Sequence, residues 1–216
     1  MIEFAGIALL PDWPVFLAFA LSGLALNIVP GADMAFVTAA AARAGRRDGL
    51  LAALGIGAGA LFHILAAVVG LSAILASSQA AFAALKWVGA AYLLWLAVSM
   101  LRSRGKASDA PRPPSGWRLF RAAMLVNLLN PKVALFFLAF LPQFVDPAAE
   151  VPALQILFLG LWFDLVGTIV NAVVALAAAG AAARLRHVAW LGRAARGLGA
   201  AAMAGLAVQL VLSERR

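Results

Sequence analysis

Long apolar stretches, separated by short polar or basic segments, make up most of this chain. The stretches lie at residues 14–42, 50–76, 80–101, 119–141, 153–183 and 188–212. Each is long enough, as an α-helix, to cross the hydrocarbon core of a bilayer, which takes roughly 20 residues. The short alternating segments typical of a membrane β-barrel are not seen. The pattern predicts an all-α integral membrane protein with six transmembrane helices.

Composition supports this class and excludes others. Of the 216 residues, 65% are hydrophobic and only 12% are charged, which leaves too little polar surface for a soluble globule. The 17 Lys and Arg residues give a net charge of +8, but they lie mainly between the apolar stretches, where they face lipid headgroups. Because no basic helix or aromatic stacking surface accompanies them, we expect no nucleic-acid partner. The absence of cysteine excludes disulfides and thiolate metal sites.

Basic residues favour alternate connections between the stretches. Residues 1–12 contain no Lys or Arg, so they lack the basic leader of a signal peptide and we expect the first stretch to stay in the mature protein. By the positive-inside rule the basic connections face the cytoplasm, which puts both termini outside. The basic residues of these connections are Arg43, Arg46, Arg47, Arg102, Arg104, Lys106, Arg112, Arg118, Arg121, Arg184, Arg186, Arg193 and Arg196.

One basic, proline-rich linker divides the chain. Residues 103–118 contain Pro111, Pro113 and Pro114, so we expect a mobile cytoplasmic loop inside a single transmembrane domain that spans 1–216. The loop separates a first three-helix half (13–102) from a second (119–213). Because three crossings per half give the halves opposite topologies, we expect two inverted three-helix repeats, an arrangement found in secondary transporters.

The first apolar stretch of each half is interrupted in a similar way. Residues 27–33 read NIVPGAD, and residues 127–132 read NLLNPK. Each segment has an Asn, two apolar residues, a proline-centred break and then a charge. Proline removes a backbone N–H and crowds the preceding turn, so we expect helices one and four to be interrupted at Pro30-Gly31 and Asn130-Pro131. Paired interruptions of this kind indicate the binding site of a transporter.

Asp33, Lys132 and Asp164 are charged residues that lie deep inside apolar stretches, far from the polar boundaries. Each is ten to twelve residues from the polar boundary of its stretch, about 15 to 18 Å along a helix, so we expect all three near the middle of the membrane. Each charge there opposes insertion by roughly 2.5 to 3.5 kcal/mol. Two interpretations stay open: a structural Asp33–Lys132 ion pair, or a substrate or proton site in which one acid stays unpaired.

Polar residues near these charges complete a candidate substrate and proton site. Asp164, Thr168 and Asn171 share one helix face, which would either line a cavity or pack against a helix. His63 is either a packing residue or a proton relay. The GIGAG segment at 55–59 indicates close helix packing and not a nucleotide-binding motif. The predicted site, with no metal ligand and no cofactor, consists of Asn27, Pro30, Gly31, Asp33, Asn127, Asn130, Pro131, Lys132, Asp164 and Asn171.

Several segments, in this order, resemble the LysE/RhtB family of amino-acid exporters. The resemblance covers about residues 13 to 145. One departure is Ala32, where the family usually has the second proline of Pro-Gly-Pro, and its loss would loosen the break without removing it. The segments that carry the resemblance are 27–34, GRRDG at 45–49, 54–59 with His63, KWVGAAYLLWL at 86–96, and 127–132 through FLPQF at 140–144.

The resemblance implies a transporter of a bacterial inner membrane and not an enzyme. Such a protein exports amino acids or their derivatives from the cytoplasm, in exchange for protons. The helix after Pro30 would direct its N–H groups at a substrate carboxylate, assisted by Lys132, while Asp33 or Asp164 would hold the ammonium group or the proton. A small-ion or metal-cation exporter and a non-transporting assembly subunit remain as alternatives. The glycines at 55–59 would serve a homodimer as well as a contact within one chain.

Overall fold

The computed structural model describes residues 11–71, 115–146 and 149–181 together with a few isolated positions. The expected third helix (80–101), sixth helix (188–212) and most of the loop at 103–118 lie outside them. The isolated described positions are residues 3, 4, 7, 8, 87, 91, 94, 95, 98, 201, 204 and 208.

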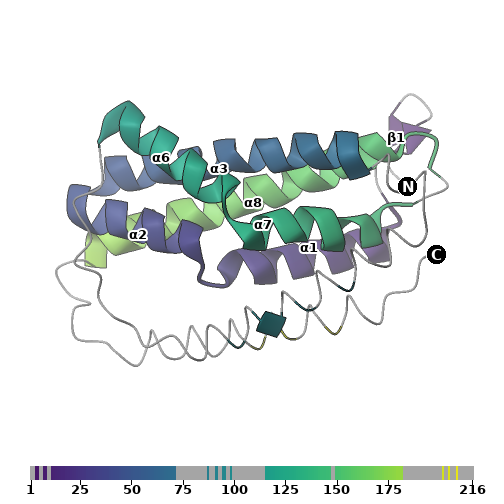
Figure 1. Ribbon diagram of the computed structural model, residues 1–216, viewed down its shortest axis with the longest axis horizontal. Helices are drawn as coiled ribbons and strands as arrows, with labels where there is room; N and C mark the ends of the chain where they lie inside the picture. The colour runs from purple at the N-terminus through teal and green to yellow at the C-terminus, as the bar shows by residue number, and fades with distance from the viewer. Residues whose placement is uncertain are drawn as a thin grey trace.

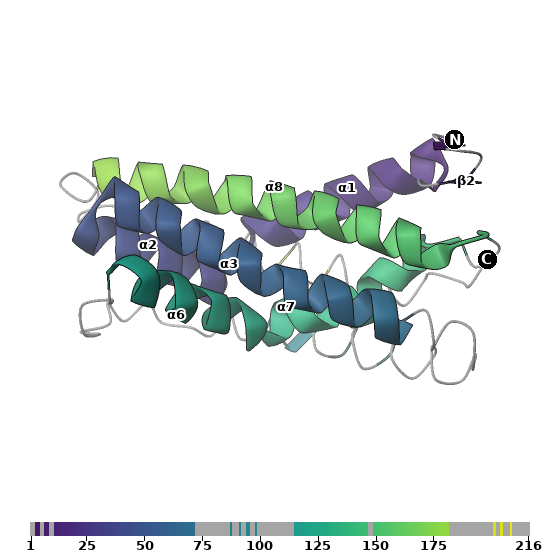
Figure 2. The ribbon, with the colours of Figure 1, turned by 90° about the horizontal axis from the view of Figure 1, so that it is seen from above.

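The described helices run roughly side by side in an elongated bundle (Figures 1 and 2). Helices α3 and α8 are each long and apolar enough to cross a membrane, and the bent pairs α1–α2 and α6–α7 qualify when each pair counts as one span. The helices are α1 (Trp13–Ile28), α2 (Ala32–Ala44), α3 (Arg46–Ala66), α6 (Gly116–Leu128), α7 (Pro131–Leu135) and α8 (Pro152–Ala181). A π-helix, η1 (Ala67–Leu71), follows α3, and a π-helix, η2 (Phe136–Phe140), and a 3-10 helix, η3 (Leu141–Phe144), follow α7.

Both expected interruptions are confirmed. Helices α1 and α2 are bent by 51° at their break, and α6 is bent by 47° against the segment Pro131–Phe144. The two prolines supply the reason, because neither has an N–H to continue the preceding helix. After the second break, the Asn130 side chain caps α7 by accepting a hydrogen bond from the Lys132 backbone N–H at 3.0 Å, as an N-cap residue does.

Two features differ from the expectation. The helix expected over 119–141 does not continue as a regular α-helix, because after α7 the chain winds first as η2 and then as η3, which contains Pro142. Before α1, the strands β1 (Glu3–Phe4) and β2 (Ile7–Ala8) form a short antiparallel pair in which Glu3 lies opposite Ala8. Strands of two residues are too short to leave a periodic signal in the sequence.

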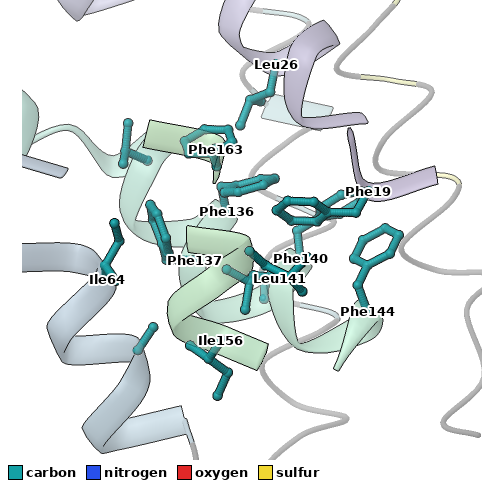
Figure 3. Packing of buried hydrophobic residues seen from close by; sticks show 14 of the residues in the cluster. Phe19, Leu26, Ile64, Phe136, Phe137, Phe140, Leu141, Phe144, Ile156 and Phe163 are labelled. Atoms are coloured by element: carbon teal, nitrogen blue, oxygen red, sulfur yellow. The ribbon is translucent and has the colours of Figure 1, made fainter. Parts of the chain in front are cut away.

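Aromatic side chains form the core at the end of the bundle where α1 begins (Figure 3). Phe19 of α1 packs on Phe144 of η3 with ring centroids 5.3 Å apart, and Phe136 of η2 stacks on Phe163 of α8 at 4.1 Å. At the other end the core consists mainly of alanines, together with Val37, Ile56 and Leu119. The first cluster joins residues from both sides of the 103–118 linker.

Glycines let α3 lie directly against both α6 and α8 (Figure 2). A Cβ on Gly55 would come 2.5 Å from the Phe120 carbonyl oxygen of α6, and one on Gly59 would come 2.6 Å from that of Met124. On the opposite side, a Cβ on Gly57 would lie 2.5 Å from Thr168 Oγ1 of α8. The close packing expected of residues 55–59 is therefore confirmed, and it brings α3 beside the second break.

Candidate functional site

The break between α1 and α2 receives a side chain from the other half of the chain. Because Pro30 has no N–H, the carbonyl of Leu26, four residues earlier, loses its helical hydrogen-bond donor. The Lys132 ammonium donates instead to Leu26 O at 3.1 Å and to Val29 O at 3.0 Å. Lys132 is buried, and it caps the negative end of the α1 dipole.

The break between α6 and α7 shows the same arrangement with the halves exchanged. Pro131 leaves the carbonyl of Asn127 without its helical donor. That carbonyl accepts from Asn130 N at 2.9 Å, and His63 Nε2 of α3 lies 3.2 Å from it. A carbonyl only accepts, so this hydrogen bond assigns the imidazole proton to Nε2. The His63 ring also stacks on Phe137, with centroids 6.1 Å apart.

Asp33 lies in the first turn of α2 and bonds to the second break. Asn127 Nδ2 donates to Asp33 Oδ2 at 2.9 Å, and the positive end of the α2 dipole favours a carboxylate at this position. Within the described ranges, three buried side-chain atoms have no hydrogen-bond partner: Asp33 Oδ1, Asn127 Oδ1 and Asn130 Nδ2. An unpartnered buried polar group costs about 1 to 3 kcal/mol, so such groups indicate a site that binds something.

Asp33 and Lys132 lie at the same pair of breaks without forming a direct ion pair. The acid bonds to Asn127 and the base to backbone carbonyls. Gly31 makes room for this lysine, since a Cβ there would lie 3.3 Å from Lys132 Nζ. The structural Asp33–Lys132 ion pair, one of the two interpretations of these charges, is therefore not formed. Each residue instead makes its own set of hydrogen bonds.

The remaining predicted residues lie on α8 or, in the case of Asn27 of α1, against it. Asn27 Nδ2 donates to the Phe163 carbonyl at 3.2 Å, and a Cβ on Gly167 would come 2.8 Å from Asn27 Oδ1. Asp164 Oδ1 accepts a long hydrogen bond from Thr168 at 3.5 Å and faces Gly57. Asn171 is buried further along α8. In the described part of the chain, no hydrogen bond joins Asp164 or Asn171 to Asp33 or Lys132.

The sequence prediction missed the carbonyls of Leu26 and Val29, and it did not place His63 at the second break. Counting back four residues from each proline finds the carbonyls of Leu26 and Asn127, but only the packing of the helices identifies their partners. In the described ranges, no three His, Cys, Asp or Glu side chains gather where they could hold a metal ion.

Comparison with known proteins gives related membrane translocators. A family model described as LysE type translocator matches residues 24–214. An uncharacterized membrane protein of Vibrio cholerae is 36% identical over 64% of this chain and 69% of its own. The homoserine/homoserine lactone efflux protein of Salmonella typhi is 34% identical over 74% of this chain and 77% of its own. The leucine efflux protein of Klebsiella pneumoniae is 28% identical over 70% and 73%, respectively. No solved structure matches.

Proposed function

Because the chain belongs to the LysE type translocator family, we propose that it exports amino acids or their derivatives from the cytoplasm across a bacterial inner membrane, in exchange for protons. The observation that carries the proposal is the pair of breaks, where Asp33 and Lys132 are buried beside two Asn side chains, each with one amide atom that has no partner among the described residues. Charges at membrane depth mark substrate and ion pathways, and discontinuous helices form the binding sites of many transporters. The relatives named for homoserine and leucine efflux suggest the first substrates to test.

An amino acid presents one ammonium and one carboxylate, and the site has a group for each. Asp33 Oδ1, which has no partner among the described residues, would accept from the substrate ammonium. The N-terminal N–H groups of α2 and the third ammonium proton of Lys132 would donate to the substrate carboxylate. We assign the exchanged proton to Asp164, which stands apart from this pair and, among the described residues, has only a long hydrogen bond from Thr168.

The contacts at the breaks also support an inverted-repeat mechanism. The Leu26 and Asn127 carbonyls, each four residues before a proline, receive nitrogen atoms of Lys132 and His63 from the opposite half. Rocking of one half against the other would expose the site to each side in turn. The basic ends of the helices, including Arg46 and Arg118, would face the cytoplasm, with both termini outside.

Transport by the purified protein in liposomes tests the proposal. Efflux of labelled homoserine and leucine should fall to background in Asp33→Asn and Lys132→Met, and Asp164→Asn should lose its response to an imposed pH gradient. Asp12→Asn is the matched control, because Asp12 is an exposed acid just before α1. Wild-type transport in all three site variants would end the proposal, and uptake of divalent cations without any amino-acid transport would favour the metal-exporter alternative.

A further inference from the structure

The Lys132 ammonium lies at the type of position where other transporters bind a metal ion. Where transmembrane helices are discontinuous, unwound carbonyls and the C-terminal ends of half-helices coordinate the coupling Na⁺. In this protein the Leu26 and Val29 carbonyls at the end of α1 form that group, and Lys132 Nζ lies 3.1 and 3.0 Å from them.

The surroundings of this position favour a positive charge. Pro30 leaves the Leu26 carbonyl without a helical donor, and the C-terminal end of α1 adds the negative end of a helix dipole. A buried cation with such partners is stabilised, whereas the oxygens alone would lack a donor.

We propose that Lys132 is a tethered cation, which fills a monovalent-cation site formed by Leu26 O and Val29 O at the end of α1. The wild-type protein then needs no free Na⁺ or K⁺ to hold the first break together. Cutting the side chain back to a methyl group opens the site to a free monovalent cation. The Lys132 side chain lies beside Gly31, where a Cβ would come 3.6 Å from Lys132 Cε and 3.8 Å from Cδ, so the volume that the truncation empties is next to a residue without a side chain.

Thermal unfolding of Lys132→Ala tests the site without any transport assay. The purified variant is heated in sodium, potassium, methylammonium or choline chloride at equal ionic strength. We expect Tm in at least one of the three small cations to exceed Tm in choline by about 3 °C or more, once the cation is about ten times its Kd. Wild type and Lys132→Met should unfold at the same temperature in all four salts, because an ammonium or an apolar chain already fills the site.

A transport measurement extends the test, and this part rests on the proposed function. Wild-type efflux should be equal in sodium and choline, whereas Lys132→Ala should recover efflux in the cation that stabilises it. Equal Tm of Lys132→Ala in all four salts, failure to recover it folded in any of them, or a sodium requirement of the wild type would overturn the tethered cation. Cation-dependent stabilisation in a protein that moves no amino acid would instead leave the site standing and count against the exporter.

Discussion

Single residues set the chemistry of the two breaks. Pro30 and Pro131 each leave one carbonyl without its helical donor, and Lys132 and His63 supply nitrogen atoms to those carbonyls across the halves. Each contact therefore couples one half to the backbone of the other. A change at either nitrogen should be felt as a loss of stability at the break it serves.

His63 allows the packing and relay interpretations to be separated. His63→Leu removes the bond to Asn127 O and the stacking on Phe137, so we expect a loss of about 1 to 2 kcal/mol in the free energy of unfolding. His63→Gln keeps an N–H donor and should lose less. Thermal unfolding measures both variants. Unchanged stability of His63→Leu combined with loss of proton-coupled efflux would instead support the relay.

Ala32 is the first residue of α2, and it stands where the LysE/RhtB resemblance expects proline. Proline is favoured at the first position of a helix, because the N–H that it lacks has no helical partner there. We therefore expect Ala32→Pro to fold, to keep transport and to gain up to about 1 kcal/mol in unfolding free energy. Denaturation and efflux assays measure these effects. A variant that misfolds would show that residue 32 must adopt a backbone conformation that proline cannot take.

At the level of elements, glycine contacts determine how closely α3 approaches its neighbours. Gly55→Ala would put a methyl group 2.5 Å from the Phe120 carbonyl oxygen and 2.7 Å from Ala123 Cβ. We expect it to destabilise the protein by about 1 to 3 kcal/mol, as overpacking does. Gly180→Ala in α8 is the matched control, since a Cβ there meets nothing within 4 Å. Unfolding temperatures compare the two, and equal values would contradict the close approach of α3 and α6.

The bend between α1 and α2 depends on a missing backbone donor. Pro30→Ala restores an N–H that can bond to Leu26 O in place of Lys132, which favours a straighter helix. We expect efflux to fall to background while the protein still folds. Pro14→Ala is the control, because Pro14 lies in the first turn of α1, where proline disturbs no hydrogen bond. Efflux at the wild-type rate in Pro30→Ala would show that the bend is not needed.

For the whole molecule, the charges divide the bundle into two unlike ends. The end of α2 and the starts of α3 and α6 lie together at one end (Figure 1), and they carry Arg43, Arg46 and Arg118. The aromatic core lies toward the other end, where α1 begins. By the positive-inside rule the first end should face the cytoplasm.

Because the chain has no cysteine, single introduced thiols report this orientation directly. Arg46→Cys and Arg118→Cys should react with a membrane-impermeant reagent only after cells are permeabilised. Asp12→Cys and Glu150→Cys, exposed at the opposite end, should react in intact cells. Mass shifts of the labelled protein measure the outcome, and the reverse pattern would invert the topology and, with it, the direction of the proposed export.

The sequence by itself determined the helical membrane class, the approximate spans of the helices that the structure describes, and both breaks. These follow from local properties, namely the length of an apolar stretch and the missing N–H of Pro30 and Pro131. Helix ends were close to the expected ones, with α8 at Pro152–Ala181 against an expected 153–183. The winding of η2 and η3 was not foreseen, because the apolar pattern of 136–144 is compatible with several helix types.

Only the tertiary structure decided the partners of the charged residues. From charge alone, Asp33 and Lys132 are natural partners, yet the acid bonds to Asn127 and the base to carbonyls of α1. A side chain reaches a carbonyl more than a hundred residues away only because helix packing brings the two breaks together, and the glycines of α3 bring α6 close enough for His63 to reach Asn127. Which orphaned group meets which donor is therefore a property of the packed bundle and not of any one segment.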